Sequence, residues 1–157
     1  MHSADEAGIP IDNHIKAFCF AKDNDIKCAA NAAEAKGPES AWETIENIYP
    51  LRIGHGVRSA EDVELLIFLK ENKIHLKVCP TSNIQVNVFD EIEDNCVDNI
   101  FNFGISRSIN SDTRTISNVT LEKEYQLLTK IYNWEKDHFK KCDLEAIEHS
   151  FATEEVK

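Results

Sequence analysis

The sequence predicts an α/β fold in which parallel strands alternate with helices. Short apolar runs occur at four places, and amphipathic stretches with helical spacing separate them, without a Gly-, Ser- or Pro-rich linker between about residues 14 and 134. A polar segment closely follows each run. A closed (β/α)8 barrel needs eight such units and about 250 residues, whereas this chain has four units in 157 residues. We therefore expect about half of a barrel.

The four predicted strands are the apolar runs themselves. Each run is short, rich in Ile, Leu, Val or Ala, and lies next to residue types that are common in turns. The runs are residues 26–30, 51–53, 74–79 and 105–109. In half a barrel the strands near residues 26 and 105 would be edges, and exposed edges recruit other chains, so we expect self-association or a loose fold.

The first two helices are predicted from spacing and from proline. Residues 14–22 place Phe18 on one apolar face. Gly37 and Pro38 open the second helix, since proline favours the first helical position, and Pro50 ends it.

Capping signals predict the next two helices. Ser59 and Asp62 stand in capping-box spacing before an apolar stripe at about residues 63–70, and Gly104 is the expected C-cap of a helix at residues 98–103.

The last third is predicted to be helical and to end in a charged tail at residues 152–157. Its two apolar stripes are Leu121, Tyr125, Leu128 and Tyr132, then Phe139, Leu144, Ile147 and Phe151. We expect residues 1–157 to form a single incomplete domain.

The composition excludes several classes of partner. Lys plus Arg number 17 against 28 Asp plus Glu, and a net charge of −11 has the wrong sign for nucleic acid or an anionic membrane. No apolar run approaches the roughly 20 residues of a membrane helix, and residues 1–8 do not read as a leader. The five cysteines form no Cys-x-x-Cys pair, so we expect mostly reduced core thiols and a cytoplasmic protein.

One polar residue near the end of each strand is a candidate for a functional site. Glu34, His55, Asn83 and Asp112 follow the four strands in order, and the carboxyl ends of parallel strands meet at one edge. Two carboxyl groups and an imidazole suit metal-assisted hydrolysis, in which a cation activates water and a Glu moves protons. The alternative is that these residues cap helices or bind backbone amides. We predict residues 79–83 to be a polar loop that Ser82 and Asn83 help to fix.

The order of three motifs resembles the adenosine deaminase family. The motifs are Arg52-Ile53-Gly54-His55-Gly56-Val57, Cys79-Pro80-Thr81-Ser82-Asn83 and Ser108-Ile109-Asn110-Ser111-Asp112. Residues 34–40 also resemble the stretch after the family's His-Ala-Gly-Glu motif, and residues 8–10 the segment before it. The resemblance covers about residues 5–151 and corresponds to the C-terminal half of the family's TIM (β/α)8 barrel.

The resemblance implies a chemistry and a role for each retained residue. Family members use one zinc ion to deaminate adenosine to inosine and ammonia, in purine nucleoside metabolism. Glu34 matches the acid that moves a proton at the purine ring, His55 the histidine that orients the attacking water, and Asp112 a zinc ligand. The implied partner is adenosine or a related purine nucleoside.

The chain departs from the family pattern at the other metal positions. It has no His-x-His pair, and it carries Asn31 and Ala33 where the motif has His and Gly. Thr113 replaces the second of two paired aspartates. We therefore expect impaired zinc binding and weak or absent activity, unless ligands come from another chain or from His2. The alternative is a non-catalytic remnant or an interaction module.

The remaining conspicuous residues have ordinary structural interpretations. We expect His14 and His75 to be partly buried histidines without a site role and Trp42 to pack under the sheet. Residues 91–94 read as a solvated acidic loop, and Cys79 as a buried thiol.

Overall fold

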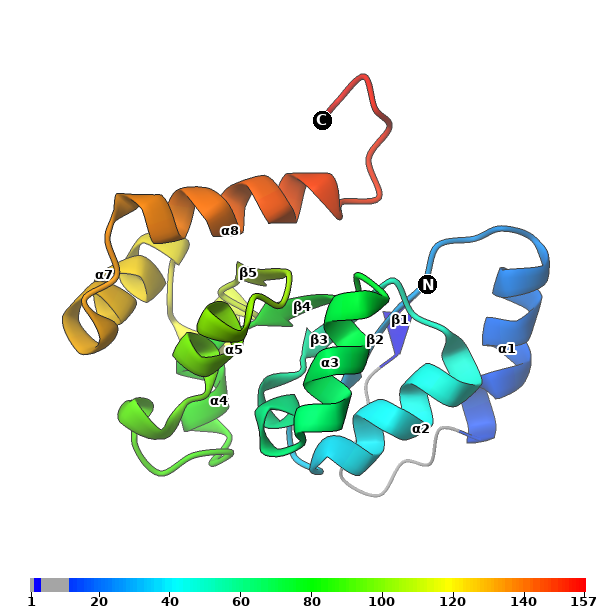
Figure 1. The fold of residues 1–157 in the computed structure, drawn as a ribbon, viewed down its shortest axis with the longest axis horizontal. Coiled ribbons are helices and arrows are strands. Elements are labelled where there is room, and N and C mark those ends of the chain that lie inside the picture. Colours follow the sequence, from blue (N-terminus) through cyan, green and yellow to red (C-terminus); the bar gives the residue numbers. More distant parts are fainter. Residues whose placement is uncertain (1, 4–11) are drawn as a thin grey trace.

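The chain forms one parallel sheet with helices packed around it (Figure 1). The structure, a computed structural model, describes residues 2–3 and 12–157. The resemblance at residues 8–10 lies outside these residues, as does the side chain of His2. The strands follow one another in the order β1 (His2–Ser3), β2 (Ala29–Ala32), β3 (Arg52–His55), β4 (His75–Val78) and β5 (Arg107–Ile109). The α/β class and the four main parallel strands are confirmed.

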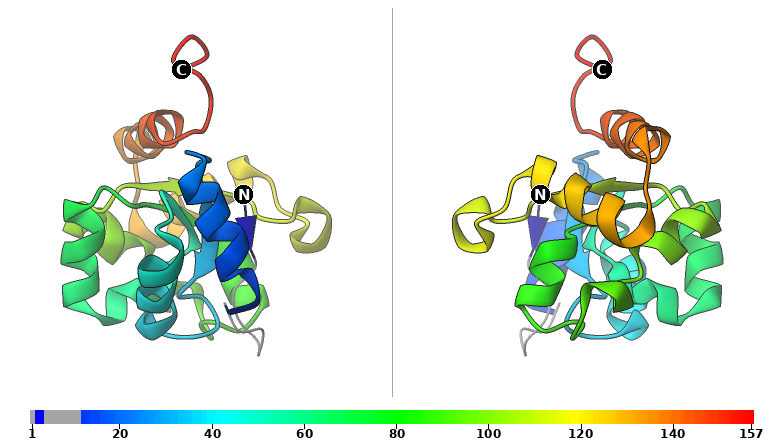
Figure 2. Two further views of the ribbon diagram at one scale, coloured as in Figure 1. Left: turned by 90° about the vertical axis from the view of Figure 1, so that its right-hand side faces the viewer. Right: turned by 90° about the vertical axis from the view of Figure 1, so that its left-hand side faces the viewer.

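The helices connect successive strands and continue beyond the last one. They are α1 (Asp12–Asp23), α2 (Pro38–Ile48), α3 (Val63–Glu71), α4 (Pro80–Gln85), α5 (Val97–Phe103), α6 (Arg114–Ser117), α7 (Leu121–Tyr132) and α8 (Lys136–Glu148), with 3₁₀ turns η1 (Val57–Glu61) and η2 (Ile92–Asp94). Helices α7 and α8 both pack near β5, whereas α1 lies at the opposite end of the sheet beside α2 (Figures 1 and 2).

The strand register places a row of residues on one face of the sheet. Asn31 pairs with Gly54, and Gly54 pairs with Lys77 on the next strand. Paired residues of neighbouring strands point to the same face. Each of these residues is the third of four in its strand, so the register aligns the three strands near their carboxyl ends, where the candidate site lies.

The main core lies between the sheet and α3, α5, α7 and α8. Its buried aliphatic residues include Leu65, Leu69, Leu76, Ile100 and Leu128. Trp134 is also buried, and its indole nitrogen donates a hydrogen bond of 2.8 Å to Asp98 Oδ1. Trp42 packs against the same core while partly exposed, in agreement with the prediction.

Two histidines were predicted to be partly buried and to have no role in the site. His14 is partly buried, whereas His75 is more completely buried than predicted. His14 is half-buried at the start of α1. His75 is buried, and its two ring nitrogens each lie 2.9 Å from a serine hydroxyl, of Ser106 and Ser108. Burial and the neighbouring His149 lower the pKa of His75 to about 3. The ring is a neutral part of the polar packing between β4 and β5.

The prediction for the first main strand is wrong in its position. Asp25 adopts a left-handed conformation with φ 54°, and Ile26 N–H donates to Ala21 O at 2.8 Å. These residues therefore close the end of α1, and Ile26 is 48% exposed. This strand is not an edge either, because β1 pairs with β2. The other expected edge, β5, does end the sheet.

Two predictions of local structure are also corrected. Residues 79–83 are mostly helical, because Pro80 opens α4 and Asn83 N–H donates to Cys79 O. Asp62 alone is the N-cap of α3 and accepts from the amides of Glu64 and Leu65, whereas Ser59 lies in η1.

The second apolar stripe predicted in the last third does not exist as a buried stripe. Leu144 and Ile147 are 56% and 46% exposed, and Phe151 lies beyond the end of α8. Helix α8 instead buries Cys142. The acidic residues at 91–94 are mainly exposed, as expected.

Among the described residues, no helix is long and apolar enough to cross a membrane.

Candidate functional site

Three of the polar side chains predicted to share a site touch one another. Glu34 Oε1 lies 2.9 Å from His55 Nδ1 and 3.0 Å from Asn83 Nδ2, and Asn83 Nδ2 lies 3.2 Å from His55 Nδ1. The three residues come from the ends of β2 and β3 and from α4. His55 and Asn83 are buried, and the Glu34 side chain is 17% exposed.

These distances restrict where protons lie. A carboxylate oxygen and an unprotonated imidazole nitrogen both accept hydrogen bonds, so a 2.9 Å contact between them requires one shared proton. With that proton on His55 Nδ1, Glu34 Oε1 accepts hydrogen bonds from both His55 and Asn83. The arrangement can exchange a proton between a carboxyl group and an imidazole.

The backbone turns sharply at the ends of the strands that carry the site. Ala33, His55 and Asp112 all have positive φ angles, of 50°, 59° and 53°. Non-glycine residues rarely adopt this left-handed conformation, and such residues concentrate at functional sites.

Asp112 is placed near the other residues but is bonded separately. Its Oδ2 accepts a hydrogen bond of 2.8 Å from Ser82 Oγ, so α4 contacts both Asp112 and the Glu34–His55 pair through consecutive residues. Asp112 is exposed. Thr113, next to it, is exposed as well and is the N-cap of α6.

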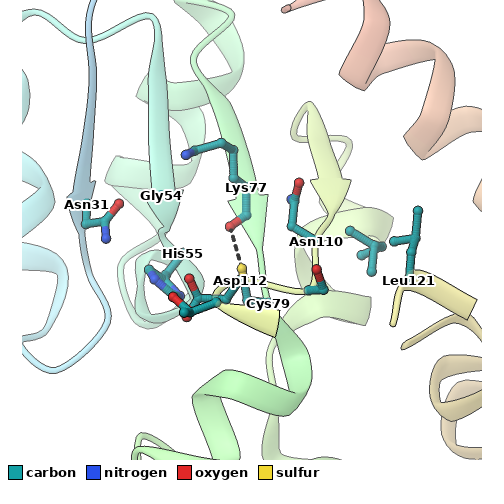
Figure 3. A pocket seen from close by; sticks show the side chains of 11 residues that line it. Asn31, Gly54, His55, Lys77, Cys79, Asn110, Asp112 and Leu121 are labelled. Atoms are coloured by element: carbon teal, nitrogen blue, oxygen red, sulfur yellow. Dashed lines mark hydrogen bonds between the residues drawn. The ribbon is translucent and has the colours of Figure 1, made fainter. Parts of the chain in front are cut away.

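A cavity of about 430 Å³ lies beside this site, with His55 and Asp112 in its wall (Figure 3). Ligand pockets range from about 300 to 1,000 Å³, so this volume suits a small molecule. The lining residues include Asn31, His55, Lys77, Asn110 and Asp112, whereas Glu34 and Asn83 do not line the cavity. The cavity is thus walled by amide, imidazole, ammonium and carboxyl groups.

Burial shifts the titration of two groups in the cavity wall. Burial, with the nearby Arg52, lowers the pKa of Lys77 below its usual value. Burial, with the nearby Asp112, raises the pKa of the Cys79 thiol, which donates to Lys77 O over 3.6 Å. Cys79 is therefore a protonated, buried thiol, and a thiol is a poor nucleophile and metal ligand.

Glu124 supports the site from α7 and was not singled out from the sequence. It is fully buried, and both of its carboxyl oxygens lie 3.3 Å from Thr81 N in the first turn of α4. Burial raises its pKa to about 7. Its spacing in the sequence could have indicated its burial. Glu124 lies four residues before the buried Leu128 on an amphipathic helix, and residues four apart lie on the same face of a helix.

The residues present do not fit a complete zinc site. Within residues 2–3 and 12–157, no three His, Cys, Asp or Glu side chains gather closely enough to hold a metal ion. Asn31 offers a neutral amide and lies directly over Gly54, where an added Cβ would come within 1.9 Å of Asn31 Oδ1. Structural zinc takes four ligands and catalytic zinc three from the protein, typically His, Cys or carboxylate. Asp112 alone falls short of that set.

The fold and the position of the cavity define the class of protein. The chain is an α/β-barrel half with polar side chains at the carboxyl ends of parallel strands, where barrels of this class carry their sites. The family model described as "Adenosine deaminase" matches residues 2–157. The chain belongs to the adenosine deaminase family.

Individual relatives extend well beyond the matched region. An adenosine deaminase from Clostridium acetobutylicum is 33% identical over 155 residues, which are 99% of this chain and 46% of the relative. The chain therefore spans about half the length of the curated relatives it matches.

Solved structures show the same fold. An adenine deaminase from Arthrobacter aurescens superposes with a TM-score of 0.91 and 22% identity, over 98% of this chain and 48% of that one. An amidohydrolase from Burkholderia ambifaria, solved with bound zinc, gives a TM-score of 0.86 at 18% identity, over 98% and 44% of the two chains.

Proposed function

We propose that the chain forms the purine-binding part of an adenosine-deaminase site and that, by itself, it binds zinc weakly. Such a chain converts adenosine to inosine and ammonia slowly or not at all. One observation carries the proposal: His55 and Asp112 line one small cavity, yet the described residues around it do not make up a metal site. The named activity of the Clostridium relative supports the choice of substrate.

In this proposal the chain's own residues bind the base and move protons. The amides of Asn31 and Asn110 offer donors and acceptors to a purine in the cavity. His55, held by Glu34, orients a water through its second ring nitrogen. Glu34 exchanges a proton with His55. The resemblance implies that it also exchanges one with a ring nitrogen of the purine, for which the base must reach Glu34 beyond the lining of the cavity. Asp112 is the remaining zinc ligand.

A physical magnitude supports the low activity. Zinc lowers the pKa of bound water from about 15.7 to about 7, and without it hydroxide at neutral pH is scarce by many powers of ten. Full structural ligand sets bind zinc with roughly 10 to 16 kcal/mol, which a single carboxylate does not approach. Retained proton-transfer residues do not compensate for that loss.

A second function, an interaction module without catalysis, is favoured by the substitutions themselves. Asn31 and Thr113 stand where the resemblance implies an imidazole and a carboxylate. A chain that no longer binds nucleoside would have no use for either group. We also infer a cytoplasmic location from its five free cysteines, three of them buried.

The test combines metal content, product and binding on the purified chain. We expect little bound zinc, little inosine by chromatography, and adenosine binding in roughly the millimolar range by calorimetry. His55→Gln should weaken adenosine binding, while the matched control His14→Gln, on α1 and away from the cavity, should not. Rapid inosine formation contradicts the low-activity proposal. If calorimetry detects no binding at millimolar adenosine, the interaction module is the function that remains.

A further inference from the structure

Lys77 is a charged residue to which the proposed function gives no role. It belongs to β4 and lines the cavity of about 430 Å³, which we call the site cavity, together with His55 and Asp112. Among the described residues that line this cavity, Lys77 is the single lysine or arginine and Asp112 the single carboxylate. A cation therefore offsets the charge of the carboxylate before any metal ion enters the cavity.

The strand register places Lys77 near the position of a missing metal ligand. Asn31 pairs with Gly54, and Gly54 pairs with Lys77, so Asn31 and Lys77 lie on the same face of the sheet on either side of a glycine. Asn31 covers Gly54, where an added Cβ would come within 1.9 Å of Asn31 Oδ1. The Lys77 side chain leaves β4 on the side of Gly54 (Figure 3). The ammonium group therefore extends toward the position at which the resemblance implies an imidazole on the metal.

Direct contacts do not neutralise the ammonium group. Within residues 2–3 and 12–157, Lys77 Nζ takes part in no ion pair and in no side-chain hydrogen bond. Burial and the nearby Arg52 lower the pKa of Lys77, whereas Cys79 and Asp112 act in the opposite direction. Asp112 thus stabilises the charged form of Lys77 through space.

A protonated lysine opposes a metal ion in two ways. Its nitrogen carries three N–H donors and no lone pair, so it cannot be a ligand. It also repels a divalent ion twice as strongly as a monovalent ion at the same distance, and salt screens this repulsion less in a partly buried site than at an exposed one. Missing ligands alone predict weak binding that added ligands restore in full. Lys77 predicts that zinc binds less tightly than the added ligands allow.

We propose that Lys77 is a specificity-determining residue that excludes divalent cations from the site cavity, where its ammonium group offsets the charge of Asp112 in place of a metal ion. The inference rests on the proposed function and names a second cause of its low zinc affinity, besides the missing ligands. A cavity with this balance of charge accepts a neutral nucleoside more readily than a metal cation. Purine binding, however, is not required for the exclusion.

The test measures zinc affinity in the full chain at neutral pH by chelator competition. Asn31→His offers a second ligand beside Asp112 and provides a background in which binding is easier to measure. Lys77→Leu removes the charge and adds no ligand atom, and it should raise zinc affinity about tenfold or more in this background and in the parent chain. Lys77→Arg keeps the charge and should give no such gain.

The matched control removes the same charge elsewhere. Lys16→Leu, at an exposed position of α1 that does not line the cavity, changes the net charge by the same amount and should leave zinc affinity unchanged. Circular dichroism checks the fold of each variant. If Lys77→Leu does not fold, Lys77→Gln, which is neutral and closer to lysine in length, takes its place.

The outcomes separate this inference from the proposed function. Equal zinc affinity with and without Lys77→Leu overturns the inference, as does an equal gain with Lys77→Arg or with Lys16→Leu. If the parent chain then still binds adenosine and little zinc, the proposed function stands without the inference. A gain that is specific to loss of the Lys77 charge, in a chain that binds no adenosine, supports the inference and contradicts the proposed function.

Discussion

Glu124 should make the stability of the chain depend on pH in a direction opposite to that of most carboxyl groups. Its pKa is raised from 4.5 to about 7 by burial, so the folded chain holds a proton that the unfolded chain releases. Between these values the folded state binds more protons, and the free energy of unfolding falls as pH rises. At about 1.4 kcal/mol per pKa unit, the loss is about 3 kcal/mol between about pH 4 and pH 8.5.

Glu124→Gln isolates this effect. Gln keeps an oxygen to accept from Thr81 N–H but cannot ionise, and the cost of its buried amide is the same at each pH. We expect the stability of the variant relative to the parent to rise by about 3 kcal/mol from about pH 4 to pH 8.5, measured by urea unfolding. Glu122→Gln, on the exposed side of α7, is the control and should show no such change. A relative stability of Glu124→Gln that does not vary with pH refutes the reasoning.

Three further variants test other parts of the structure. His75 has a pKa of about 3 in the folded chain against 6.5 when unfolded, so the free energy of unfolding should fall as pH falls from 6.5 toward 3. His75→Gln should reduce this dependence on pH in urea unfolding. An unchanged dependence would show that other groups cause the loss of stability in acid. Gly54→Ala places a Cβ 1.9 Å from Asn31 Oδ1 and should lower the free energy of unfolding by about 1 to 3 kcal/mol, whereas an unaltered Tm would show that the amide moves freely. Asn31→His adds an imidazole to the cavity wall and should raise zinc affinity about tenfold or more in a chelator competition, and no gain would place the position outside the metal site.

The order of elements and the meeting of Glu34, His55 and Asn83 were predictable because one rule governs them. Parallel strands bring their carboxyl ends to one edge, so residues far apart in the chain become neighbours. Asp112 follows the same rule but bonds to Ser82 instead of to the other three.

Of the features that were not predicted, two are local turns of the backbone and one depends on a tertiary contact. Ile26 is apolar, yet it closes α1 because Asp25 turns the chain into a left-handed conformation. Pro80 looked like part of a loop but opens α4. Glu124 is charged in isolation, and only its burial against Thr81 makes it a supporting residue. Local pattern does not reveal the contact between Glu124 and Thr81, because it joins residues far apart in the chain.

Zinc titration of the purified chain is the most direct test of a purine-binding site that lacks its metal. Elemental analysis after dialysis against buffered zinc should find far less than one ion per chain, and Asp112→Asn should change that content little. About one tightly held zinc ion per chain, lost in Asp112→Asn, would contradict the proposal and make the chain a metal enzyme in its own right.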